Sequence, residues 1–130
     1  MQNFKLRVAR PTDNLDQVVK QYTTGLDFKI LSQFKDHEGF DGVIIGNENS
    51  IYHFEFTHHH RTVVGKAPTQ DNLIVFYISS KEDWQTQCLK MIEAGFELVK
   101  SYNPYWDING KTFEDIDGYR VVLENSEWTK

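Results

Sequence analysis

The stretch TFEDIDGYRVVLEN, residues 112–125, has the pattern of two strands joined by a tight turn. Asp117-Gly118 is a pair favoured in short hairpin turns, because glycine adopts positive φ without a steric penalty. Aromatic and β-branched residues on both sides favour extended backbone. The stretch therefore predicts a β-hairpin with strands over 111–115 and 119–125.

Working backwards from this hairpin, the second half of the chain has the order strand, helix, strand, hairpin. NLIVFYIS (72–79) and FELVKSY (96–102) are strand-like, and between them Ser80 and Asp83 form a capping box. Gly95 is a stop signal for the helix. An apolar stripe at helical spacing is expected to face the core: Trp84, Cys88, Met91 and Ile92. The order is βαβββ.

The first half repeats this order. FKLRVAR (4–10) alternates as a strand that Pro11 ends, and the next helix is expected to be capped by Thr12 or Asp13 and stopped by Gly25. Three strand-like runs follow, over 28–34, 40–46 and 50–57. The sequence thus predicts one α+β domain built of two βαβββ modules, about 3–57 and about 72–127, with a connector over 58–71. Their strands are expected to form a curved eight-stranded mixed sheet around a cup, with the helices outside.

Composition excludes several classes of protein. The net charge of −5 and the lack of a Lys/Arg run argue against a nucleic-acid partner. No apolar run approaches the roughly 20 residues that span a membrane, and the first ten residues do not resemble a signal peptide, so a cytoplasmic location is expected. Cys88, the one cysteine, cannot form an internal disulfide and is expected to be a small buried hydrophobe.

The doubled βαβββ order and the ending TFEDIDGYRVVLEN resemble the vicinal oxygen chelate superfamily, which includes glyoxalase I, bleomycin-resistance proteins and extradiol dioxygenases. Ile116 stands where that family usually has proline. The run Asn-Pro-Tyr-Trp at 103–106 also resembles a group of small glyoxalase-like proteins. The resemblance implies the cup-shaped fold, a small organic ligand and a homodimer.

Metal-dependent members of this family bind a divalent cation through four strand positions, usually His or Glu. Carried over one position at a time, these fall on Arg7 or Leu6, on Glu55, on Asn72 or Asp71, and on Val122. At most two of these can be ligands, whereas catalytic zinc sites usually supply three. No cofactor is therefore predicted. The alternative is a weakly held divalent metal on Glu55 and His53.

Alternation along 52–57 separates two faces of the expected strand. Tyr52, Phe54 and Phe56 should pack under the helices, whereas His53 and Glu55 should line the cup. Other charged side chains are expected to join them there: Lys5, Arg7, Arg120 and Glu124. These groups either form partly solvated ion pairs that replace a lost metal cluster, or receive a carboxylate-bearing ligand on Arg7 or Arg120.

Two further features leave alternatives open. His58, His59 and His60 are adjacent on extended chain, so their side chains diverge, and they are expected to lie in a solvated connector rather than bind one cation. Tyr105 and Trp106 are either a flat wall of the pocket or a structural plug at one end of the barrel.

The resulting prediction is a metal-independent protein that binds a small organic molecule. Its expected pocket consists of Arg7, His53, Glu55, Asn72, Tyr105, Trp106 and Arg120. The alternative is a lyase or isomerase of the same fold in which Glu55 is the general base.

Overall fold

The first module consists of five elements in the computed structural model, which describes residues 4–129. They are β1 (Leu6–Pro11), α1 (Leu15–Leu26), β2 (Lys29–His37), β3 (Phe40–Gly46) and β4 (Tyr52–His59). The strands form a sheet of order β1-β4-β3-β2, in which β1 is parallel to β4 and the other pairs are antiparallel. Residue 3, with which the first module was expected to begin, lies outside the described residues.

The second module repeats this arrangement. It consists of β5 (Leu73–Tyr77), α2 (Lys81–Glu93), β6 (Glu97–Val99), α3 (Tyr105–Ile108), β7 (Gly110–Glu114) and β8 (Arg120–Glu124). Its sheet has the matching order β5-β8-β7-β6, again with one parallel pair. The predicted α+β class and the doubled βαβββ order are confirmed, with the eight strands divided between two four-stranded mixed sheets. The short helix α3 was not predicted.

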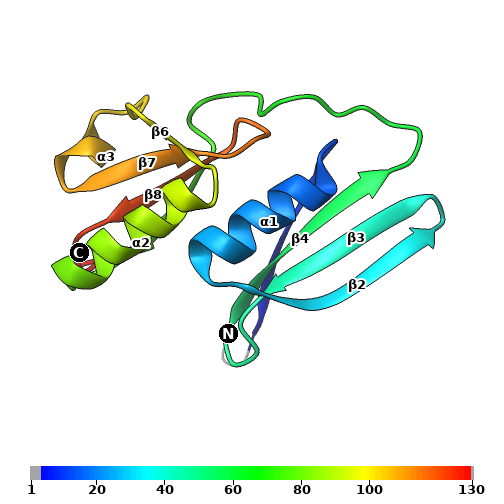
Figure 1. Ribbon diagram of the computed structural model, residues 1–130, viewed down its shortest axis with the longest axis horizontal. Helices are drawn as coiled ribbons and strands as arrows, with labels where there is room; N and C mark the ends of the chain where they lie inside the picture. Colours follow the sequence, from blue (N-terminus) through cyan, green and yellow to red (C-terminus); the bar gives the residue numbers. More distant parts are fainter. Residues whose placement is uncertain (1–3, 130) are drawn as a thin grey trace.

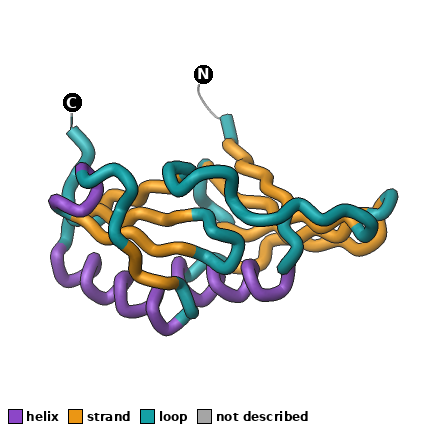
Figure 2. The backbone as a smooth tube through the Cα atoms, turned by 90° about the horizontal axis from the view of Figure 1, so that it is seen from above, coloured by secondary structure: helices purple, strands orange, loops and turns teal. Residues whose placement is uncertain are grey.

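The helices α1 and α2 lie side by side on one face of the two sheets (Figures 1 and 2). The core fills the space between helices and sheets, because the inward residues of each strand and the apolar stripe of each helix meet there. Its fully buried members include Tyr22, Ile45, Met91, Phe113 and Leu123. The opposite face of the sheets is therefore available for a site. No helix among the described residues is long and apolar enough to cross a membrane.

The beginning of α1 differs from the prediction. Asn14 is its N-cap residue, and no side chain caps it. The Asp13 carboxylate instead accepts hydrogen bonds from the backbone N–H groups of Val64 and Gly65 in the connector, at 2.9 and 2.8 Å. Thr12 accepts from the Asn14 N–H through its hydroxyl. The cap prediction was wrong because Asp13 binds the connector and Thr12 binds the N–H of the N-cap residue, so neither side chain reaches the first N–H groups of the helix.

The two glycines that were expected to end the helices have different roles. Gly95, with φ 89°, ends α2 as predicted. Gly25 does not end α1, which continues to Leu26. A Cβ at Gly25 would lie 3.0 Å from both Met91 and Phe96, so its small size allows α1 to pack closely on the second module. The strand β1 also includes Pro11 rather than ending before it, since an edge strand tolerates proline.

Candidate functional site

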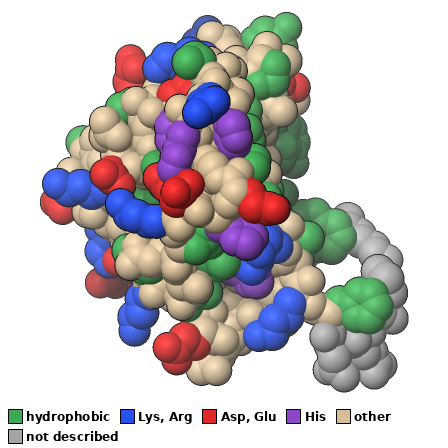
Figure 3. Space-filling view, turned by 90° about the vertical axis from the view of Figure 1, so that its right-hand side faces the viewer, with side chains coloured by type: hydrophobic (Ala, Val, Ile, Leu, Met, Phe, Trp, Pro, Cys, Tyr) green, Lys and Arg blue, Asp and Glu red, His purple; other side chains and the backbone are tan. Residues whose placement is uncertain are grey.

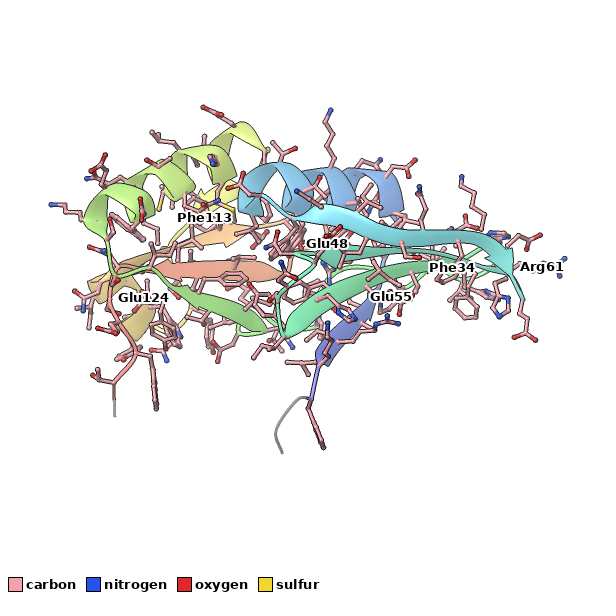
Figure 4. The ribbon with its side chains drawn as sticks, turned by 90° about the horizontal axis from the view of Figure 1, so that it is seen from below. Phe34, Glu48, Glu55, Arg61, Phe113 and Glu124 are labelled. Carbon is pink, nitrogen blue, oxygen red and sulfur yellow. The ribbon has the colours of Figure 1, made fainter. Side chains whose placement is uncertain are left out.

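The strand β4 presents aromatic and polar side chains to opposite faces, as its alternation predicts. Phe54 and Phe56 are buried beneath the helices. Glu55 points to the face of the sheet that lies away from the helices (Figure 4). In the parallel pair with β1, His53 lies opposite Arg7 and Glu55 lies opposite Ala9. The predicted polar side chains of the two strands therefore share this open face.

Arg7, His53 and Glu55 form a connected polar group on the open face. Arg7 Nε donates a hydrogen bond to His53 Nε2 at 2.9 Å. The guanidinium is the donor in this bond, and the ring nitrogen is the acceptor. Arg7 Nη1 lies 3.8 Å from Glu55 Oε1, and the Arg7 side chain is still 46% exposed. The guanidinium therefore has donors available for a further anion.

A pocket of about 350 Å³ lies beside this group, between the first module and the second. We call it the inter-module pocket. Its lining comes from β1, β4, β8 and the chain around the start of β5: Val8, Ala9, Arg10, Pro11, Phe54, Glu55, Phe56, Asn72, Leu73, Ile74, Tyr119 and Arg120. Of the predicted pocket residues, Glu55, Asn72 and Arg120 line it, whereas Arg7 and His53 do not. The volume is within the range of small-molecule sites.

Arg10 is the charged residue of the pocket that sequence analysis did not identify. Its guanidinium lies between the rings of Phe56 and Tyr119, 4.8 and 3.9 Å from their centres. Its Nη2 donates to Asp115 at 2.9 Å and its Nη1 donates to Asp117 at 3.0 Å. The signal that could have indicated it is the Asp-Ile-Asp-Gly turn itself, because two buried carboxylates need a cationic partner.

Asp115 is the centre of this buried network. It also accepts a hydrogen bond from the Tyr22 hydroxyl at 2.7 Å and from the backbone N–H groups of Asp117 and Tyr119. Burial raises the pKa of Asp115, although Arg10 and these donors act in the opposite direction. Burial also raises the pKa of the Tyr22 phenol well above its ordinary value. The network fixes the wall of the pocket on which Tyr119 lies.

Arg120 is held within its own module. Its Nε donates to Glu114 Oε2 at 3.0 Å and its Nη1 donates to the Lys100 carbonyl at 3.3 Å. It is 5% exposed. The pocket therefore meets a guanidinium that already has two protein acceptors, in contrast to the more exposed Arg7.

The open face of the second sheet carries buried polar groups. Thr112 and Glu124 are both buried, and Thr112 Oγ1 and Glu124 Oε2 have no hydrogen-bond partner among the described residues. Figure 4 shows Glu124 on the side of the sheet away from α2, whereas Phe113 lies between α2 and the sheet. Burial raises the pKa of Glu124, and the nearby Asp107 raises it further. Glu124 is thus buried on the face of the second sheet away from α2, and it is not among the residues that line the inter-module pocket.

Tyr105 and Trp106 lie on α3, which packs against β7 of the second module. Their rings meet edge to face, with centres 5.0 Å apart, and Tyr105 is 60% exposed. Neither is among the residues that line the inter-module pocket. The structure therefore separates them from Glu55, Asn72 and Arg120 within one chain.

The three adjacent histidines lie at one end of the molecule, among acidic and basic side chains (Figure 3). They were expected in the connector, but His58 and His59 are the last residues of β4, where they pair with β3, and only His60 follows the strand. His58 Nδ1 donates to the Thr12 carbonyl, whereas His59 binds the Thr62 hydroxyl. His60 Nε2 lies 2.9 Å from an Asp41 oxygen, and this hydrogen bond lowers the pKa of Asp41. Each ring thus has its own protein partner. Within residues 4–129 no group of three or more His, Cys, Asp or Glu side chains has a geometry that could hold a metal ion.

The four positions at which metal-dependent relatives bind a cation have unsuitable donors here. Val122 has no side-chain donor atom and is fully buried. Arg7 is a cation beside Glu55. This leaves one carboxylate and the amide of Asn72, fewer than the three protein ligands that a catalytic divalent site usually supplies. The residues present do not fit the divalent metal of the family.

Comparisons with known proteins agree with this fold. Residues 6–57 match the YycE-like N-terminal domain, and residues 71–125 match the YycE-like C-terminal domain. The chain is 38% identical over 126 residues to the uncharacterized protein YycE of Bacillus subtilis (strain 168), covering 97% of this chain and 91% of the relative.

Solved structures give the same answer. A crystal structure of a YycE protein of unknown function from Bacillus subtilis has 37% identity and a TM-score of 0.90, covering 100% of this chain and 95% of the other. Glyoxalase I of Leishmania major has 19% identity and a TM-score of 0.73, with coverage of 96% and 88%. The fosfomycin resistance protein FosX of Mesorhizobium loti has 10% identity and a TM-score of 0.72, with coverage of 98% and 94%. The chain belongs to the YycE-like family and has the glyoxalase/bleomycin-resistance fold of the vicinal oxygen chelate superfamily.

Proposed function

We propose that the protein binds a small organic molecule with an anionic group at the inter-module pocket, without a resident metal ion. The proposal rests on the contact between Glu55 and the partly exposed Arg7. Where metal-dependent relatives use two ligands, this chain has an ion pair 3.8 Å long whose arginine is 46% exposed. Arg7 does not itself line the pocket, but it lies beside Glu55, which does. A ligand that reaches Glu55 therefore meets a positive charge where metal-dependent relatives have a metal ion.

The surroundings support a ligand with both charged and apolar parts. Arg7 can donate two parallel hydrogen bonds to a carboxylate, which Lys cannot do. Apolar side chains from both modules provide the remaining contact area: Val8, Phe54, Phe56, Leu73 and Ile74. Asn72, at the entrance to β5, adds an amide that can donate and accept.

A homodimer is part of this proposal. The strands β1 and β5 are each the edge of a sheet, with one side unpaired by the other strands of that sheet. Leu6 and Val8 of β1 are 59% and 43% exposed, although both are apolar. Exposed apolar side chains on an edge strand are a liability in a monomer, and a second copy of the chain would cover them.

A ligand screen by thermal shift tests the proposal, because a ligand that binds the folded state raises the melting temperature. Small aromatic carboxylates should be compared with their uncharged amides, in buffer with and without chelator. We expect a carboxylate to raise the melting temperature in both buffers. The shift should disappear in Arg7→Gln and persist in Arg61→Gln, an exposed arginine at the far end of the first module (Figure 4). A hit that requires metal, or that survives Arg7→Gln, would contradict the proposal.

A catalytic function is the second candidate. The Glu55 side chain is 15% exposed, and its closest charged partner is 3.8 Å away rather than in direct hydrogen-bond contact. A carboxylate held this loosely beside a pocket can accept a proton from a bound molecule. Once a ligand is known, Glu55→Gln separates the candidates: retained binding with loss of turnover supports a lyase or isomerase, whereas a ligand that no variant converts supports binding alone.

A further inference from the structure

The helix α2 has two apolar stripes, of which the fold uses one. Cys88 and Met91 are buried against the sheet. Leu89 and Ile92, each one residue later, are 65% and 48% exposed. Ile92 was expected to belong to the core stripe, but the rotation of about 100° per residue takes it away from the sheet. The helix α2 therefore carries a second apolar stripe that the core does not cover.

These side chains line a groove between α2 and the outer strands of the second sheet. The groove has a volume of about 320 Å³ and is separate from the inter-module pocket. Its lining consists of Trp84, Gln85, Cys88, Leu89, Ile92, Leu98, Lys111 and Phe113. Leu98 of β6 pairs with Phe113 of β7, which points it toward α2, and it is 49% exposed. Figure 1 shows α2 lying along this sheet, with β6 at its edge.

The walls of the groove are fixed in place. Trp84 Nε1 donates a hydrogen bond to the Leu123 carbonyl at 2.8 Å, which sets the plane of the indole. Cys88 lies in the floor of the groove. Burial raises the pKa of its thiol, so this neutral group adds to the apolar surface. The floor is completed by Phe113, which is fully buried between α2 and the sheet (Figure 4). Little ordering of the protein would be needed when a ligand binds.

The charge of the groove indicates which ligand it suits. Lys111 is the one charged residue among the eight that line it, in a chain whose net charge is −5. Its ammonium group lies 5.4 Å from the centre of the Trp84 ring, beside the apolar wall. Glu97, the acidic neighbour of Leu98, pairs with Glu114 and so projects from the other face of the sheet. The groove thus combines an apolar trough with a positive end.

We propose that this groove binds an amphiphilic carboxylate, whose hydrocarbon chain lies along Leu89, Ile92 and Leu98 and whose carboxylate pairs with the Lys111 ammonium group. The site is independent of the proposed function of the inter-module pocket. It extends the interactions of the protein to fatty-acid-like molecules on the opposite, helix-bearing face.

Titration with decanoate below its micelle concentration, followed by amide chemical shifts, tests this site. We expect saturable one-to-one binding, with the largest shifts in α2 and β7 rather than around Glu55. Decanol, which has the same chain without the charge, should bind more weakly. Lys111→Gln should lower the affinity for decanoate about twofold to fivefold, the effect of one exposed charge pair, while leaving decanol nearly unchanged.

Two further variants complete the design. Leu89→Ser should weaken decanoate and decanol together, because it removes shared apolar contact; its exposure allows the change without loss of the core. Lys20→Gln, an exposed lysine on α1, should alter neither. Three results would overturn the proposal: no saturable binding, equal effects of Lys111→Gln and Lys20→Gln, or self-association that Leu89→Ser abolishes, which would make the groove a contact between copies of the chain.

Discussion

Arg10 and Tyr119 join the two modules, with the guanidinium carbon of Arg10 lying 3.9 Å from the centre of the Tyr119 ring. Arg10 belongs to β1, and Tyr119 immediately precedes β8. Because Arg10 also donates to Asp115 and Asp117, the hairpin turn of the second module is fastened to the first strand of the first. The inter-module pocket has Arg10 and Tyr119 in its lining, so its shape depends on this contact.

Replacing Arg10 by Met should destabilise the fold strongly. The side chain of Arg10 is 14% exposed and that of Asp115 is fully buried, so the variant would leave a buried carboxylate without its cation. Loss of one partner of a buried ion pair typically costs about 3–5 kcal/mol. Urea denaturation should show a lower free energy of unfolding by roughly this amount.

The pH dependence of this loss provides its control. Burial raises the pKa of Asp115, so protonation is easier in the folded chain than in the unfolded one. The deficit of Arg10→Met should be present at neutral pH and should shrink below the ordinary aspartate pKa of about 3.9, where the carboxyl is protonated in both states. Arg61→Met, on the exposed surface, should change the free energy of unfolding by less than about 0.5 kcal/mol. Equal stability of the two variants would show that Arg10 does not hold the modules together.

The arrangement of the strands and long helices could be predicted because each depends on local signals. Asp117-Gly118 specifies the last hairpin, and φ of 87° at Gly118 matches the conformation that glycine permits. Alternation predicted which residues of β4 are buried, since one side of the strand must face the helices. These patterns repeat in both halves, so the order of elements followed from either one.

The connections between the modules could not be predicted because they depend on tertiary contacts. Arg10 appears in the sequence as one more charged residue near the end of a strand. No local pattern shows that Asp13 binds the connector. Nor does one show that residue 25 must be glycine because Met91 and Phe96 leave little room for a Cβ there. Tyr105 and Trp106 were expected in the pocket because their turn can overhang the cup of this fold, but their place on α3 depends on how the turn packs against β7.

Gly42→Ala should destabilise the first module through Phe34. The two residues are partners across β2 and β3, and a Cβ at Gly42 would overlap the Phe34 ring. Gly42 is not among the glycines with positive φ, so the cost comes from the ring and not from the backbone. Overpacking of this kind typically costs about 1–3 kcal/mol. In a Phe34→Ala background the same change should cost much less, as a double-mutant cycle by urea denaturation can measure; additive effects would exclude this contact as the cause.

Glu124→Gln should flatten the dependence of stability on pH. Burial raises the pKa of Glu124, so its contribution to stability is fully present below the unfolded pKa of about 4.3 and is lost as the pH rises through the higher folded pKa. The neutral amide does not ionise, so the variant should gain stability relative to wild type near neutral pH, on the order of 1 kcal/mol, and little in acid. Melting temperatures from pH 3 to pH 8 would show this gain, and Glu93→Gln on the exposed side of α2 should not.

Removal of divalent metal ions should leave the stability unchanged. A metal held at a hundred times its dissociation constant contributes about 2.7 kcal/mol to folding, which a chelator would remove as a fall of several degrees in melting temperature. The donors at the four family positions include a cation at Arg7 and no donor at Val122, so we expect no such fall and less than one equivalent of zinc, nickel or iron by elemental analysis. If metal is found, Glu55→Gln and the pair His59→Gln and His60→Gln locate it. Loss of the metal with Glu55→Gln alone would return the site to the metal-dependent chemistry of the superfamily, whereas loss with the histidine variants would place the ion at the end of β4, away from the pocket.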